Sequence, residues 1–178
     1  MNPCDYDINN PEFENDRPTY ELLASGKTNG VFQVESAGMK DLLIRLKPKL
    51  EQLDFEVISV VLALYRPDSM GALDEYVEMA TGGSRPPSIH PDMDKILKDT
   101  NYCMIYQEQL LDIVKKFGGR TYGGADLFRK AIGKKIVELV QKESEILRSE
   151  IVANGYSKDI ADKIADELSK KGGYLFNK

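Results

Sequence analysis

Four cationic side chains stand close together in one short segment of the chain: Arg129, Lys130, Lys134 and Lys135. We expect a helix that ends at Gly133, followed by a second helix whose first turn contains the two later lysines. Cations in a first turn oppose the helix dipole, which costs about 0.3–1 kcal/mol each unless an anion binds there. Backbone N–H groups at a helix start, together with Arg and Lys, commonly hold a triphosphate. The segment therefore predicts a phosphate-binding site, with an ordinary basic surface turn as the alternative.

The charge of the chain is unevenly distributed. Residues 115–135 contain seven Lys or Arg and one Asp, although the whole chain has a net charge of −5. Local potential rather than net charge attracts a phosphate, so this segment indicates an anion-binding surface, with a solvated helix face as the alternative. Within it we expect Lys130 to pair with Asp126 one turn away, and Arg129 to point elsewhere and remain free.

Carboxylates for metal-assisted chemistry are poorly supported. Two divalent ions about 4 Å apart need two or three acidic side chains. The sequence contains two Asp-x-Asp pairs, Asp5/Asp7 and Asp92/Asp94. The first lies in an acidic start, where residues 1–25 carry six acidic side chains against one Arg. Asp92 suits the first turn of a helix. We therefore expect no metal site and no catalytic residue in this chain.

Histidine and cysteine chemistry is equally unsupported. His90 is the only histidine, and its surroundings suggest neither a catalytic triad nor a metal site. Cys4 and Cys103 lack Cys-x-x-Cys spacing, which favours reduced thiols in a cytosolic protein. No apolar run approaches the ~20 residues of a membrane span, and a signal peptide is not recognisable. We expect a cytoplasmic chain with no membrane contact.

Apolar residues recur at helical spacing through almost the whole chain, so the predicted fold class is all-α, with many helices. The segment from Leu50 to Tyr65 is apolar on all sides and is predicted to be one buried central helix, with Pro48 ending the helix before it. Residues 82–87 are predicted to form a flexible loop. Other helices are expected at Thr19–Ser25, Glu35–Leu46, Met70–Met79, from His90, at Tyr106–Phe117, at Ile136–Ile151 and from Ser157.

Five motifs, in order and in register, resemble the bacterial DNA polymerase III alpha subunit of the DnaE type, a replicative polymerase of the C family. The resemblance extends from about Thr19 to Lys178. It rests on Gly30-Val-Phe-Gln-Val-Glu-Ser36 with Gly38-Met39, Ala63-Leu-Tyr-Arg-Pro67, Tyr106-Gln-Glu-Gln109, Gly124-Ala-Asp126 continuing through Arg129-Lys130-Ala-Ile-Gly-Lys-Lys135, and Tyr174-Leu-Phe-Asn-Lys178.

The resemblance implies that residues 19–178 are the helical fingers domain, with a possible subdivision near the 82–90 loop. Residues 1–18 would be an acidic lead-in from the palm side. In this family the fingers contact the incoming deoxynucleoside triphosphate and close over the new base pair. The metal-binding aspartates belong to the palm, so the resemblance implies a fragment that is inactive alone, of a parent DNA-directed DNA polymerase.

Carried over by position, Arg129 and Lys130 match a basic pair that touches the triphosphate, and Lys134 and Lys135 match neighbouring lysines. The pair is usually two arginines, and a lysine lacks the planar bidentate fork. Three further residues match motifs around the active-site cleft: Gln33, Arg66 and Tyr106.

The implied partners are dNTP, primer-template DNA, the palm and thumb of the same chain and, through them, the replication holoenzyme. The chain itself is expected to bind no cofactor, with Mg²⁺ in the palm of the parent. A non-catalytic helical module whose cations contact the DNA backbone is the alternative function. A helical protein-interaction domain is the third class, and it predicts a large exposed apolar patch.

Overall fold

The computed structural model describes residues 15–52, 54–85 and 87–178, except the side chain of Asp68. Within these ranges the chain forms α-helices, short turns and single-turn 3-10 helices, without a β-strand; one isolated bridge joins Tyr106 to Phe176. The predicted all-α fold class is confirmed. Cys4, Asp5, Asp7 and most of the predicted lead-in lie outside the described residues.

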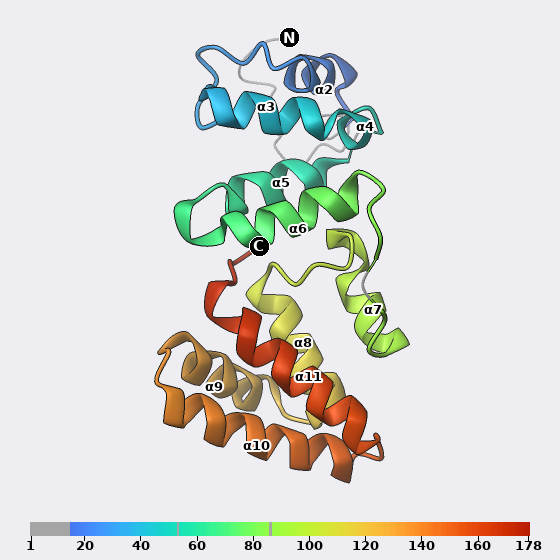
Figure 1. Ribbon diagram of the computed structural model, residues 1–178, viewed down its shortest axis with the longest axis vertical. Coiled ribbons are helices and arrows are strands. Elements are labelled where there is room, and N and C mark those ends of the chain that lie inside the picture. Colours follow the sequence, from blue (N-terminus) through green and yellow to red (C-terminus); the bar gives the residue numbers. More distant parts are fainter. Residues whose placement is uncertain (1–14, 53, 86) are drawn as a thin grey trace, which may run out of the picture.

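The helices stack along one long axis, with the N-terminal half at one end and the C-terminal half at the other (Figure 1). The chain end returns to the middle, between the two halves. The first half contains α2 (Arg17–Ala24), α3 (Ala37–Arg45), α4 (Lys47–Leu50), α5 (Phe55–Leu64) and α6 (Met70–Ala80). The second contains α7 (Pro91–Leu97), α8 (Gln107–Gly118), α9 (Tyr122–Gly133), α10 (Val137–Ala153), α11 (Lys158–Lys171) and the 3-10 helix η4 (Gly172–Tyr174).

The predicted central helix begins only at Phe55, and Leu50 instead ends the short helix α4. Pro48 does not end a helix; it lies in the first turn of α4, where the missing N–H of proline is not needed. The chain then turns before α5 begins at Phe55. The α5 helix is not buried all round, because α4, α6 and the turn at 98–100 cover only part of its surface. Phe55 and Leu62 remain exposed.

Each half of the molecule has its own group of buried side chains. The N-terminal group is centred on α3, α5 and α6 and includes Leu43, Val60, Leu64 and Tyr76. The C-terminal group lies among α8, α9, α10 and α11. Its largest fully buried members are Phe117, Phe128, Leu110, Ile113 and Leu147. Burying such side chains contributes about 1.5–3 kcal/mol each, so each group supplies much of the stability of its half.

Local capping follows the sequence closely. The hydroxyl oxygens of Ser36 and Ser157 accept hydrogen bonds at the starts of α3 and α11. His90 caps α7, where its Nδ1 accepts from the N–H of Asp92, and its ring contacts Phe117 edge-on. His90 therefore has a structural role. No helix in the described ranges combines the length and the apolar character that crossing a bilayer requires.

Candidate functional site

The two lysines after Gly133 do not lie in the first turn of a helix, as the sequence predicted. Lys134 is the C-cap of α9, and Lys135 has a left-handed backbone with φ of 55°. That conformation interrupts the helix, so α10 begins only at Val137. Both cations therefore follow the negative end of the α9 dipole, where a positive charge is favoured. Since neither lysine lies within the first turn of α10, the argument for anion binding depends on the charge balance instead.

Ion pairs remove most of the positive charge that the sequence places in residues 115–135. Five of its seven cations have carboxylate partners: Lys115 with Asp112, Lys116 with Asp92, Arg120 with Glu143 and Glu150, and both Arg129 and Lys130 with Asp126. Lys134 and Lys135 form no ion pair with any carboxylate that the structure describes. The unbalanced charge is thus concentrated at the bend between α9 and α10, which we call the α9–α10 bend (residues 133–136).

Arg129 is not free, contrary to the expectation. Its Nε lies 2.8 Å from Oδ1 of Asp126, and its Nη1 donates to Oε1 of Gln107 over 3.1 Å. Positions three apart share a helix face, so the long arginine side chain reaches Asp126 as easily as Lys130 does. The predicted Lys130–Asp126 pair is present, with Nζ 2.7 Å from Oδ2. Lys130, and then Arg129, lower the pKa of the Asp126 carboxyl below its ordinary value.

Residues 174–178, which we call the C-terminal strap, lie against the start of α8. The N–H of Phe176 donates to the carbonyl of Ile105 over 3.0 Å, and the N–H of Gln107 donates to the carbonyl of Phe176 over 2.7 Å. At the end of the strap, Nζ of Lys178 lies 2.7 Å from Oε2 of Glu56 on α5. These contacts attach one segment to both halves of the molecule.

Four of the predicted site residues gather around the C-terminal strap. The guanidinium carbon of Arg66 lies 4.9 Å from the centroid of the Phe176 ring, and Nζ of Lys135 lies 4.2 Å from the centroid of Tyr174. Tyr106 pairs with Phe176, and Arg129 reaches the strap through Gln107. Residues from four separate sequence regions are therefore brought together by tertiary packing.

Gln33 is placed differently from the other predicted residues. It lies in an exposed turn before α3, with a left-handed φ of 65°. Within the described chain it makes no hydrogen bond to the other six predicted residues. The turn is held by its neighbours, since the hydroxyl of Thr28 donates to the carbonyl of Val34 and the N–H of Gly30 donates to the Glu35 carboxylate.

Tyr106 is buried beneath the strap, with 3% of its surface exposed. Burial and the neighbouring Glu56 carboxylate raise the pKa of Tyr106 far above its ordinary value, so the phenol remains protonated. Its backbone N–H donates to Oε1 of Gln109 over 2.9 Å. A direct contact between this side chain and a substrate would require the strap to move.

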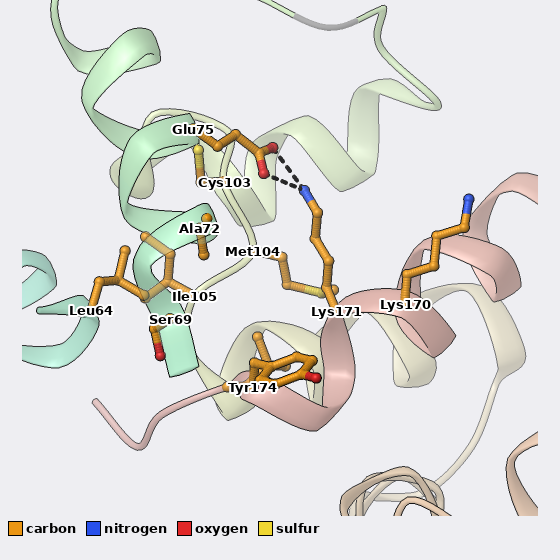
Figure 2. Close-up of a pocket in the computed structure, with 12 residues that line it drawn as sticks. Leu64, Ser69, Ala72, Glu75, Cys103, Met104, Ile105, Lys170, Lys171 and Tyr174 are labelled. Carbon is orange, nitrogen blue, oxygen red and sulfur yellow. Dashed lines mark hydrogen bonds and ion pairs between the residues drawn. The ribbon is translucent and has the colours of Figure 1, made fainter. Parts of the chain in front are cut away.

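A cavity of about 240 Å³ lies between the two halves. Figure 2 shows Glu75 and Lys171 meeting across it, with Nζ of Lys171 2.7 Å and 3.0 Å from the two Glu75 oxygens. Cys103 and Tyr174 also line the cavity, but the four cations predicted to bind phosphate do not. Burial, followed by the negative charge of Glu75, raises the pKa of the Cys103 thiol to about 12. This thiol is therefore unsuited to act as a nucleophile at neutral pH.

The carboxylates of Asp92 and Asp94 form ion pairs with neighbouring cations. Among the described residues no group of three or more His, Cys, Asp or Glu is placed to hold a metal ion. Asp92 lies in the first turn of α7, as expected, and contacts Lys95 and Lys116. Asp94 pairs with Arg85 and accepts from the hydroxyl of Ser88.

Comparison with known families decides what kind of protein carries this arrangement. Residues 4–155 match the family model of the bacterial DNA polymerase III alpha subunit finger domain. The chain belongs to this finger-domain family. The resemblance drawn from the five motifs is confirmed. The matched range includes all seven predicted site residues, whereas the C-terminal strap follows it.

Two relatives show how much of a longer protein the finger domain represents. The DNA polymerase III subunit alpha of Halalkalibacterium halodurans is 40% identical over 164 residues, which cover 92% of this chain and 14% of that protein. The subunit of the same name from Aquifex aeolicus is 39% identical over 175 residues, covering 97% of this chain and 15% of that protein. The chain thus spans about one seventh of the length of these relatives.

The sequence did not predict how Gln107, Phe176 and Glu56 support the site. Gln107 belongs to a recognised motif, but a helix start explains its polarity equally well. Phe176 and Glu56 receive their roles from contacts with residues more than 100 positions away along the chain. Spacing within one helix carries no signal for such contacts.

Proposed function

We propose that this finger domain binds the triphosphate of an incoming dNTP at the α9–α10 bend and helps to close the active site of a DNA polymerase III alpha subunit. The observation that carries the proposal is the pair of lysines, Lys134 and Lys135, without carboxylate partners in the described chain. They follow Arg129 by five and six positions along the chain. The Arg129 guanidinium is already oriented by Asp126 and Gln107.

The arginine and the three lysines have different roles in this proposal. The five N–H groups of a guanidinium are not exhausted by Asp126 and Gln107, so Arg129 can still donate to phosphate oxygens. Lys130, Lys134 and Lys135 act as point charges that neutralise the β and γ phosphates. Because lysines adapt more freely than arginine, we expect Arg129 to determine the geometry of binding.

The three other predicted residues are proposed to border the active-site cleft that the family resemblance implies. Arg66 would do so beside the C-terminal strap, where it covers the Phe176 ring. Tyr106 would support the strap from below, and Gln33 would approach from its exposed turn before α3. In this proposal the wall of the cleft is assembled from both halves, with the strap between them.

The reaction proposed for the whole protein is attack of a primer 3′-hydroxyl on the α phosphate, with pyrophosphate leaving. Mg²⁺ in the palm would activate the hydroxyl and offset developing charge. The carboxylates described above do not fit this role. The finger domain would hold the polyphosphate and exclude water as it closes. We therefore expect no polymerase activity from the chain alone.

The organisation and partners form part of the same proposal. Residues 1–18 would lead in from the palm and residues 19–178 would form the fingers, with a subdivision near the 82–90 loop. The partners would be dNTP, primer-template DNA, the palm and thumb, and the replication holoenzyme of the cytoplasm.

Steady-state kinetics of a full-length alpha subunit containing this domain test the proposal. Arg129→Ala and Lys134→Ala should each lower kcat/KM for dNTP about tenfold, because each removes one charge-assisted hydrogen bond of about 1.5 kcal/mol. Lys98→Ala, at an exposed lysine just after α7, is the control and should leave kcat/KM unchanged.

Unchanged kcat/KM for dNTP in both variants would show that the assignment is wrong. The alternative function, a nucleic-acid-binding module, predicts a different outcome. The variants would then lose DNA affinity, with the slope of log affinity against log salt reduced by about 0.9 for each phosphate contact removed.

A further inference from the structure

Both polar atoms of the Gln107 side-chain amide form hydrogen bonds to segments far away in the sequence. Its Oε1 accepts from Nη1 of Arg129 over 3.1 Å, and its Nε2 donates to the carbonyl of Leu175 over 3.2 Å. Its backbone N–H, which a first helical residue leaves without an intrahelical partner, donates to Phe176 over 2.7 Å. One residue therefore joins α8, α9 and the C-terminal strap.

The guanidinium of Arg129 is held from two directions. Asp126, on the same helix, contacts Nε and Nη2, each at 2.8 Å from Oδ1. Gln107, on α8, contacts Nη1 at another edge of the group. Because a guanidinium is planar, contacts at two edges define its plane as well as its position. A side chain held in this way loses less conformational entropy when it binds a phosphate.

We propose that Gln107 is a positioning residue for nucleotide binding, which holds the Arg129 guanidinium in its phosphate-binding orientation and ties it to the C-terminal strap. The proposal rests on the proposed function, in which Arg129 contacts the triphosphate. Gln107 itself makes no contact with the nucleotide and acts through Arg129.

The chemistry of this position favours glutamine over similar side chains. An amide offers an acceptor to the arginine and a donor to the Leu175 carbonyl at the same time. Methionine has a similar length and shape but provides no amide donor and only a weak acceptor. Asparagine keeps the amide but is one methylene shorter, so it cannot span the same two partners.

Single-turnover nucleotide incorporation by a full-length alpha subunit tests the proposal, because it measures the nucleotide Kd separately from product release. Gln107→Met should raise this Kd about three- to tenfold, with the maximal rate within about twofold of wild type. Gln141→Met, at an exposed position of α10, is the matched control and should change neither value. Gln107→Asn is the second variant and should show the same loss if Gln107→Met fails to fold.

A double-mutant cycle separates positioning from general structural damage. In an Arg129→Ala background, Gln107→Met should raise the nucleotide Kd no further, because the residue it positions is gone. Gln107→Met should still lower the melting temperature in the Arg129→Ala background, since the bond to Leu175 is lost there too. The proposal would be overturned if the Kd of the double variant rose by the product of the two single-variant increases. It would also be overturned if Arg129→Ala raised the Kd and Gln107→Met left it unchanged. If Arg129→Ala itself leaves the Kd unchanged, the proposed function fails first.

Discussion

Arg120 provides the clearest test of which cations stabilise the fold and which are available to a ligand. It lies between α8 and α9, and only 11% of its side chain is exposed. Its Nε lies 2.6 Å from Glu150 and its Nη1 lies 3.1 Å from Glu143, both on α10. The guanidinium also lies 5.5 Å from the centroid of the Phe128 ring. We predict that Arg120→Ala is strongly destabilising.

The expected magnitude follows from the burial of the three charges. Removing one partner of a fully buried ion pair costs about 3–5 kcal/mol, because the remaining charge has no compensation. Here the carboxylates are 22% and 34% exposed, so water can solvate them partly after the arginine is removed. We therefore expect the free energy of unfolding to fall by about 2–3 kcal/mol, after discounting for solvent screening. For a chain of this size the melting temperature should fall by roughly 4–12 °C.

Urea unfolding of the 178-residue chain, followed by far-ultraviolet circular dichroism, measures this change. Arg120→Lys keeps the charge but loses the fork that serves both carboxylates, so its loss should be intermediate. Lys134→Ala is the matched control from the same basic segment and should alter stability by no more than about 0.5 kcal/mol. The reasoning is refuted if Arg120→Ala unfolds within about 0.5 kcal/mol of wild type, or if Lys134→Ala is equally destabilised.

Two further predictions concern titratable groups. In a Cys4→Ser background, Cys103 should react with a thiol reagent at pH 8 on the order of 10³-fold more slowly in the native chain than in urea, because its pKa of about 12 suppresses the thiolate; equal rates would contradict the burial. An NMR titration of Asp126 should give a pKa below 3.8, and Lys130→Ala should raise it more than Arg129→Ala does. Because its pKa is lower in the folded state, the Asp126 carboxyl stabilises the fold at pH values above the pKa that it has in the unfolded chain. This stabilisation should disappear as the pH falls through the lowered pKa. A pKa of 3.8 or above for Asp126 would exclude both ion pairs.

Much of the fold follows from spacing that can be read within single helices. The apolar period predicted the helices, and the capping serines at 36 and 157 lie where helices begin. The pair of Lys130 with Asp126 was predicted because its members are one turn apart. The helix predicted from Leu50 begins only at Phe55, after the polar residues Glu51, Gln52 and Asp54, and Asp54 is its N-cap.

The amino-acid sequence by itself determined the helical class, the family and the position of the basic segment, because those depend on local period and on motifs in order. Only the tertiary structure decided which cations remain available. The carboxylates that neutralise Arg120 lie 23 and 30 residues away on α10, and the strap that gathers Arg66, Tyr106 and Lys135 comes from the end of the chain. Ion pairing depends on distances of a few ångströms between side chains, and between separate helices the packing of the core sets those distances.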